Sequence, residues 1–187
     1  MVKLTFIIYQ LTRPFSYLRI KHEEKWVYDW VIPIILTVAT VTLLGSFSSV
    51  EKVVGENGVI SQITNFVAGL PGFFIAALAA VATFNKNDID ELMANPPKLE
   101  IMFQGQSMLV EMTRRRFLCV LFSYLTAVSI FLVLLTRLCL PLTLPKEYLE
   151  FTTLLGIALY FFVLWQLVSA TLLGLFYLGE RLHTPNQ

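Results

Sequence analysis

The chain has 187 residues, of which 56% are hydrophobic and 14% charged, and its formal net charge is +1. Soluble chains average about 25% charged residues, so this one lacks the charge to cover a solvated surface. The composition excludes a soluble globular domain and a disordered chain, and the small net charge argues against direct nucleic-acid binding. We therefore expect an integral membrane protein.

Four apolar segments are long enough to cross a bilayer core, which takes about 20 helical residues. They are residues 26–47, 60–84, 117–140 and 149–178. The segments around them are an arm at 1–25, outer loops at 48–59 and 141–148, a middle loop at 85–116 and a tail at 179–187. We expect a single-domain, all-α integral membrane protein, a four-transmembrane-helix bundle with a small cytoplasmic cap.

The distribution of basic residues predicts the orientation of these spans. Of the 14 Lys and Arg residues, 11 lie in the arm, the middle loop or the tail, and 3 lie elsewhere. Positively charged loops stay on the cytoplasmic side of a membrane. We therefore expect both termini and the middle loop inside (N-in/C-in), which an even number of spans also requires.

The arm and the middle loop show weaker patterns. LTFIIYQL at 4–11 suits either a short strand that pairs with LEIMF at 99–103 or an interfacial helix lying on the bilayer. NDIDELMAN at 87–95 predicts a short helix capped by Asp88. From Ser107 onward, SMLVEMTRRRFL predicts a helix continuous with the third span.

The second span carries a stripe of small side chains at four-residue spacing. Its members are Ala68, Gly72, Ala76 and Ala80. Such a stripe lets two helix backbones approach closely. It indicates packing within the bundle or, alternatively, a homo-oligomer interface or a narrow pore. The adjacent Pro71 predicts a kink or a break in the helix.

Two polar side chains within the spans are candidate functional residues. Asp29 lies near the start of the first span, where we expect it to pair with Lys25, with a proton relay as the alternative. Gln166 lies near the middle of the fourth span. Its amide needs a partner in hydrocarbon, so we expect a hydrogen bond to another helix or, alternatively, a place in the lining of a conduit.

The sequence contains no motif for catalysis, a cofactor or a metal. His22 and His183 have no Cys, Asp or Glu at a metal-ligand spacing, and neither a nucleophile elbow nor a phosphate-binding loop is present. We expect no enzyme activity, no cofactor and no metal. Cys119 and Cys139 are about 30 Å apart along one helix and are too distant for a disulfide.

The expected cytoplasmic face is basic. Its candidate contacts for an acidic partner or for anionic membrane lipids are Arg114, Arg115, Arg116, Lys21 and Lys25. With the small-residue stripe, this face predicts a homo-oligomeric membrane scaffold or sensor that docks a cytoplasmic protein partner. The alternatives are a pore-forming effector that perturbs the membrane potential and, with less support, a small transporter.

The layout of four short spans with the inner loop FNKNDIDELMANPP and EMTRRRF resembles the membrane subunit of the bacterial Kiwa antiphage system. The resemblance is one of architecture, with spans that begin at Trp26, Ile60, Phe117 and Leu149. It implies a homo-oligomer in the bacterial inner membrane that senses phage attack and works with a cytoplasmic DNA-binding subunit. It carries over no functional residue.

Overall fold

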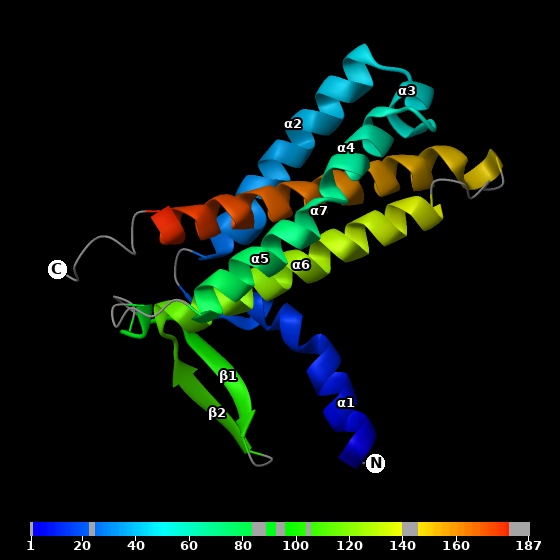
Figure 1. The fold of residues 1–187 in the computed structure, drawn as a ribbon. Helices are drawn as coiled ribbons and strands as arrows, with labels where there is room; N and C mark the ends of the chain where they lie inside the picture. Colours follow the sequence, from blue (N-terminus) through cyan, green and yellow to red (C-terminus); the bar gives the residue numbers. More distant parts are fainter. Residues whose placement is uncertain are drawn as a thin grey trace. The chain divides into compact units, whose positions relative to one another are not determined.

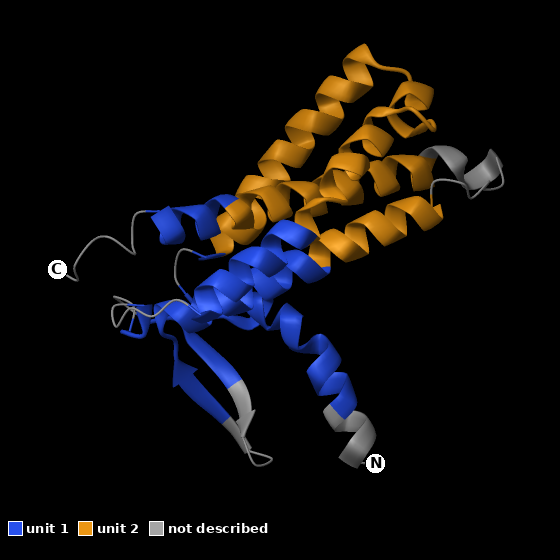
Figure 2. Cartoon of the chain, in the orientation of Figure 1, with its two compact units in different colours: residues 1–25, 72–127, 172–187 blue, residues 26–71, 128–171 orange. Residues whose placement is uncertain are grey.

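The computed structural model describes residues 2–22, 25–83, 89–92, 96–103, 106–139 and 146–179. The chain forms two compact units, shown in Figure 2. The first unit comprises residues 1–25, 72–127 and 172–187, and the second comprises residues 26–71 and 128–171. The long helices α6 and α7 each contribute residues to both units.

The elements are labelled in chain order in Figure 1. They are α1 (Val2–Thr12), the 3₁₀ helix η1 (Arg13–Arg19), the π-helical turn η2 (Val27–Val31), α2 (Ile32–Phe47), α3 (Val50–Val54), α4 (Val59–Val67), α5 (Leu70–Thr83), β1 (Lys98–Phe103), β2 (Gln106–Glu111), α6 (Arg114–Cys139) and α7 (Lys146–Gly179).

Four helical stretches in the described part are long and apolar enough to cross a membrane, as expected of a multi-pass membrane protein. They are Val27–Phe47, Val50–Thr83, Arg114–Cys139 and Phe151–Gly179. Their outer surfaces carry large apolar side chains, such as Phe47, Phe66 and Phe151, that the rest of the chain leaves exposed. A bilayer supplies the apolar surroundings that such surfaces need.

The second stretch is interrupted near its middle. Helix α4 ends at Val67, a turn occupies Ala68 and Gly69, and α5 begins at Leu70. Pro71 lies in the first turn of α5, where its missing N–H is harmless. This break is the one that the proline predicts.

The fold is predominantly rather than wholly helical, because the middle loop contains a β-hairpin (Figure 1). Strand β1 pairs antiparallel with β2, with Leu99 opposite Val110. The expectation of a helix from Ser107 onward is wrong, since α6 begins only at Arg114. Only two residues separate LEIMF from the next strand, and this proximity favours local pairing over pairing with the distant arm.

The arm forms helix α1 and not a strand, so the alternative in which it pairs with LEIMF is also wrong. It meets β1 at an isolated bridge between Lys21 and Lys98. The helix expected at 87–95 lies largely outside the described residues. The described part, residues 89–92, is a turn that ends in a bridge between Leu92 and Thr113.

The core of the first unit is built around the start of α6. Tyr17 of η1 is fully buried and stacks on Tyr124 of α6, with 4.8 Å between ring centroids. Phe74 of α5 packs near Phe122 of α6 at 6.4 Å. Aromatic packing therefore fixes both the arm and α5 to the same helix.

Helix α7 reaches this core through Gly174. A β-carbon at Gly174 would lie 3.1 Å from Cδ2 of Leu121 and 3.5 Å from the ring of Phe122. This contact is close enough that only a glycine fits without displacing its neighbours. At Gly156, on the same helix, a β-carbon would meet nothing within 4 Å.

We predict that Gly174→Leu lowers the free energy of unfolding by about 1–3 kcal/mol, because the added side chain overpacks the α6–α7 contact. Gly156→Leu makes the same chemical change at an open position and should stay within about 0.5 kcal/mol of wild type. Reversible unfolding in mixed SDS–detergent micelles measures both values. Equal effects of the two substitutions would contradict the close packing at Gly174.

Candidate functional site

The best-defined polar contact of the second unit lies where η2 leads into α2. In an α-helix, the carbonyl of Asp29 would accept a hydrogen bond from the N–H of residue 33, but Pro33 has none. The side-chain amide of Gln166 on α7 donates to that carbonyl instead, at 3.2 Å. Both residues of this bond are buried, so it pairs two polar groups away from solvent.

Asp29 itself lies within the π-helical turn η2 and is 3% exposed. Turns of this kind are frequent at functional sites. Lys25, its expected partner, is also buried, and its ammonium lies 4.1 Å from the centroid of the Tyr17 ring. The pairing of Asp29 with Lys25 stays a prediction.

Two more hydrogen bonds join α7 to its neighbours in the second unit. The indole N–H of Trp165 donates to Oγ1 of Thr40 at 3.0 Å, and that hydroxyl in turn donates to the carbonyl of Leu36. The hydroxyls of Thr64 on α4 and Tyr160 on α7 are 3.0 Å apart. These polar side chains therefore cross-link helices.

The three threonines of α2 donate back to carbonyls one turn earlier. Thr37, Thr40 and Thr42 donate at 2.6 to 2.8 Å to the carbonyls four residues before them. Their hydroxyl groups are thus hydrogen-bonded within their own helix. Among the residues that the structure describes, no three His, Cys, Asp or Glu side chains lie together as a site for a metal ion.

The small-residue stripe faces away from the core of the first unit. Gly72, Ala76 and Ala80 lie on one face of α5 and are exposed, and a β-carbon at Gly72 would meet nothing within 4 Å. The buried residues of α5 are Phe74 and Val81, which lie on the opposite face.

The fourth member of the stripe, Ala68, is exposed too, but it lies in the turn before α5. The stripe is therefore three residues long on a regular helix. Both interpretations of the stripe, packing within the bundle and an interface or pore between copies, stay predictions.

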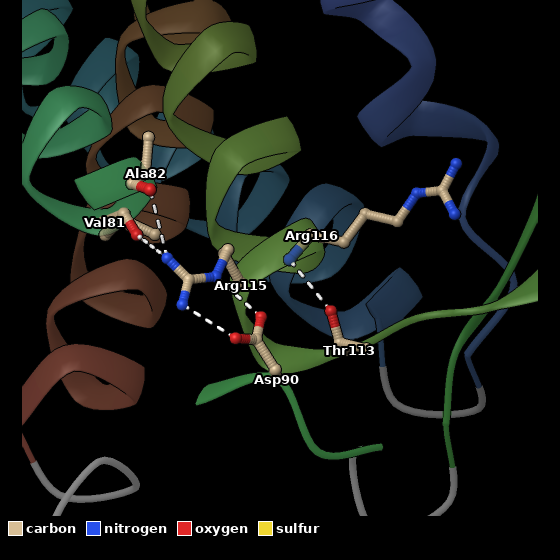
Figure 3. Close-up of polar contacts among 6 residues, drawn as sticks. All are labelled: Val81, Ala82, Asp90, Thr113, Arg115 and Arg116. Atoms are coloured by element: carbon tan, nitrogen blue, oxygen red, sulfur yellow. Dashed lines mark hydrogen bonds and ion pairs between the residues drawn. The ribbon is translucent and has the colours of Figure 1, made fainter. Parts of the chain in front are cut away.

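The basic triplet does not act as one surface. The guanidinium of Arg115 binds both carboxylate oxygens of Asp90, from Nε at 2.6 Å and from Nη2 at 2.8 Å (Figure 3). Its Nη1 donates to the carbonyls of Val81 and Ala82 at 2.9 and 3.1 Å. The last carbonyls of a helix have no partner within it, so Arg115 caps α5 and fixes Asp90 to that end.

The other four basic candidates differ in burial. Arg114 and Lys25 are buried. Arg116 is half-buried, and Figure 3 shows its side chain pointing away from Arg115. Lys21 is exposed. Of the five positions, Lys21 is thus exposed, Arg115 and Arg116 are half-buried, and Arg114 and Lys25 are buried.

The paired Arg115 guanidinium keeps the pKa of Asp90 below its ordinary value of 3.8, chiefly through the side-chain hydrogen bonds and further through the attraction of opposite charges. Asp90 was not among the candidates from the sequence, because nothing in the local pattern pairs it with an arginine 25 residues away. Pro33 and Trp165 were also missed. Pro33 carried a usable signal, since it lies four residues after Asp29.

We predict that Gln166→Leu lowers the free energy of unfolding by about 1 kcal/mol, because the carbonyl of Asp29 loses its donor. Pro33→Ala restores an N–H four residues after Asp29, so in that background Gln166→Leu should cost much less. Pro71→Ala is the matched control, because it removes a proline that faces no such amide. A double-mutant cycle in mixed micelles measures the coupling, and zero coupling would contradict this assignment.

We predict that the Asp90–Arg115 pair holds at neutral pH and is lost only in acid. Its lowered pKa means that the pair stabilises the folded state above the ordinary value of 3.8. This stabilisation disappears as the pH falls through the still lower folded pKa. Asp90→Asn should lower the protection factors of amide hydrogens at the end of α5 at pH 7 and abolish the loss of protection that the wild type shows in acid.

Glu111→Gln is the control for this exchange experiment. Glu111 also faces a basic residue, Lys98, but at 3.9 Å and with both side chains about half exposed. Exposed pairs of that kind contribute little. A change at α5 in Glu111→Gln as large as that in Asp90→Asn would show that the effect is not specific to the Arg115 contact.

Comparison with known proteins provides no relative from which a role could be transferred. No protein-family model, no curated protein and no solved structure matches this chain. The residues themselves therefore carry the functional interpretation.

Proposed function

We propose that this chain is a non-enzymatic, multi-pass scaffold or sensor of the bacterial inner membrane, which assembles as a homo-oligomer and docks a cytoplasmic protein. The observation that carries the proposal is the outward face of α5. Gly72, Ala76 and Ala80 lie exposed there on a helix that is long and apolar enough to belong to a membrane span.

This face combines exposed small side chains with large ones beside them. Phe73 and Ile75, which are 73% and 54% exposed, lie on either side of the small residues. Lipid tails solvate large and small apolar side chains equally well, so helices associate in a bilayer through close packing rather than through the hydrophobic effect. A helix of a second copy gains such packing where the backbone of α5 is uncovered.

The docking part of the proposal rests on charge. The bias of Lys and Arg toward the arm, middle loop and tail supports an N-in/C-in topology, in which the first unit contains the cytoplasmic face. Lys21 is exposed there and Arg116 is half-buried. An acidic surface on a soluble protein is the complementary partner.

The polar contacts of the second unit favour a scaffold over a pore. The amide of Gln166 is bonded to the carbonyl of Asp29, and the hydroxyls of Thr64 and Tyr160 are within hydrogen-bond distance of each other. Side chains used in this way hold helices together, whereas residues that line a conduit present their polar groups to water or ions.

The antiviral part of the proposal has a single support, which is the resemblance in layout to the membrane subunit of the Kiwa antiphage system. In that case the trigger is phage attack at the membrane, and the docked partner is a cytoplasmic DNA-binding subunit. The chain itself then needs no nucleic-acid contact.

We predict that Gly72→Leu reduces the assembled mass of the protein in mild detergent and in nanodiscs, because the leucine side chain covers the exposed backbone of α5 at this position. The monomer should keep its fold, since a β-carbon at Gly72 meets nothing within 4 Å. Gly45→Leu on α2 is the matched control, because Gly45 is equally open. Native mass spectrometry measures the mass, and an unchanged mass for Gly72→Leu would contradict assembly through α5.

Purification from the protein's own host tests docking with the same sample. A stoichiometric soluble protein should accompany the wild type and be lost from the double variant Lys21→Glu, Arg116→Glu. Lys52→Glu, a substitution in the expected outer loop, should retain it. If the wild type carries no soluble protein, the docking part of the proposal is wrong, and ion flux through liposomes becomes the next test.

A further inference from the structure

The N-terminal arm is basic, with five Lys and Arg residues against two glutamates, Glu23 and Glu24, near its end. Residues 1–22 contain no Asp or Glu and four basic residues, Lys3, Arg13, Arg19 and Lys21. A segment of this composition is attracted to the anionic surface of a cytoplasmic leaflet. The charge of the arm is thus complementary to lipid headgroups.

Helix α1 also carries apolar side chains that the described residues leave exposed. Ile7, Ile8 and Leu11 are 48%, 53% and 72% exposed. Their spacing of three and four residues places them on one face of α1. Gln10 is exposed as well and lies about 200° around the helix from Ile8. Ile8 and Gln10 therefore lie on nearly opposite sides of α1.

The packing of η1 against α6 shows how far along α6 the arm is attached. Helix α1 leads directly into η1, where Tyr17 stacks on Tyr124 and Phe15 meets the edge of the same ring at 6.3 Å. Tyr17 also meets Phe117 at 6.5 Å between ring centroids, and Phe117 lies three residues beyond Arg114, which is about 5 Å along the axis of α6. The arm is thus fixed to α6 where its apolar stretch begins.

The arginines at the start of α6 lie at the membrane surface, because charged groups are costly in hydrocarbon. The contact between η1 and Tyr124 therefore holds the root of α1 at the level of the bilayer and not out in the cytoplasm. The apolar environment closest to Ile7, Ile8 and Leu11 at that level is the acyl chains of the same leaflet.

We propose that α1 and η1 form an in-plane anchor that lies in the membrane interface and binds anionic phospholipid headgroups. The isoleucines and Leu11 enter the boundary of the acyl chains, while the basic residues of the arm contact phosphate groups. This binding site belongs to a single chain, so it does not depend on assembly through α5.

Fluorescence from one labelled position on α1 tests this proposal. Replacing both cysteines, Cys119→Ser and Cys139→Ser, provides a background in which Ile8→Cys carries an environment-sensitive NBD label. Gln10→Cys, on the polar face of the same helix, is the matched control. The full-length protein is placed in nanodiscs of phosphatidylcholine, with or without phosphatidylglycerol. Quenchers are doxyl groups on the acyl chains and iodide in the water.

The label at position 8 should emit at shorter wavelength than the label at position 10, be quenched by the acyl-chain doxyl group and resist iodide. Phosphatidylglycerol should strengthen each effect, and the double variant Arg19→Gln, Lys21→Gln should lose that response. Equal quenching of both positions by iodide would place the arm in water and overturn the proposal.

A protein occupant would give a different result. If a second copy covered Ile8, the protection at position 8 would not depend on lipid composition and would disappear in the Gly72→Leu protein. If lipid covers it, the protection persists in Gly72→Leu. The failure of the anchor and the failure of assembly through α5 are therefore separate outcomes.

Discussion

The need to pair every backbone polar group in an apolar medium explains the most specific contacts of this protein. Residue 33 is proline, so it has no N–H to donate to the carbonyl of Asp29. The amide of Gln166, on another helix, donates to that carbonyl. Pro33 and Gln166, which are 133 positions apart in the chain, thus both determine which donor the carbonyl of Asp29 has.

The same requirement operates at the end of α5. Its final carbonyls have no donor within the helix. The guanidinium of Arg115 donates hydrogen bonds to the carbonyls of Val81 and Ala82. The charge of Arg115 then needs a counterion, which Asp90 provides. One arginine therefore joins α5, α6 and the turn at 89–92. The side chain of Arg116, the next residue, points away from Arg115 (Figure 3).

Much of the helical framework was predictable because it depends on local properties. Apolar length identified the four candidate spans, and Pro71 indicated the break before α5. The hairpin was predictable only in part. LEIMF carried a strand signal, but its partner strand, Gln106–Glu111, has no alternation that distinguishes it from a helix, and pairing between the two decided its conformation.

By itself, the sequence determined that this is a membrane-type chain with four apolar helices and a stripe of small residues, because these properties follow from composition and spacing. Tertiary structure alone decided what each polar or charged side chain does. The stripe faces outward because Phe74 and Val81 occupy the opposite face of α5. Arg115 binds both Asp90 and the end of α5, whereas the side chain of the neighbouring Arg116 points away from Arg115. Such contacts join residues far apart in the chain, which no local pattern records.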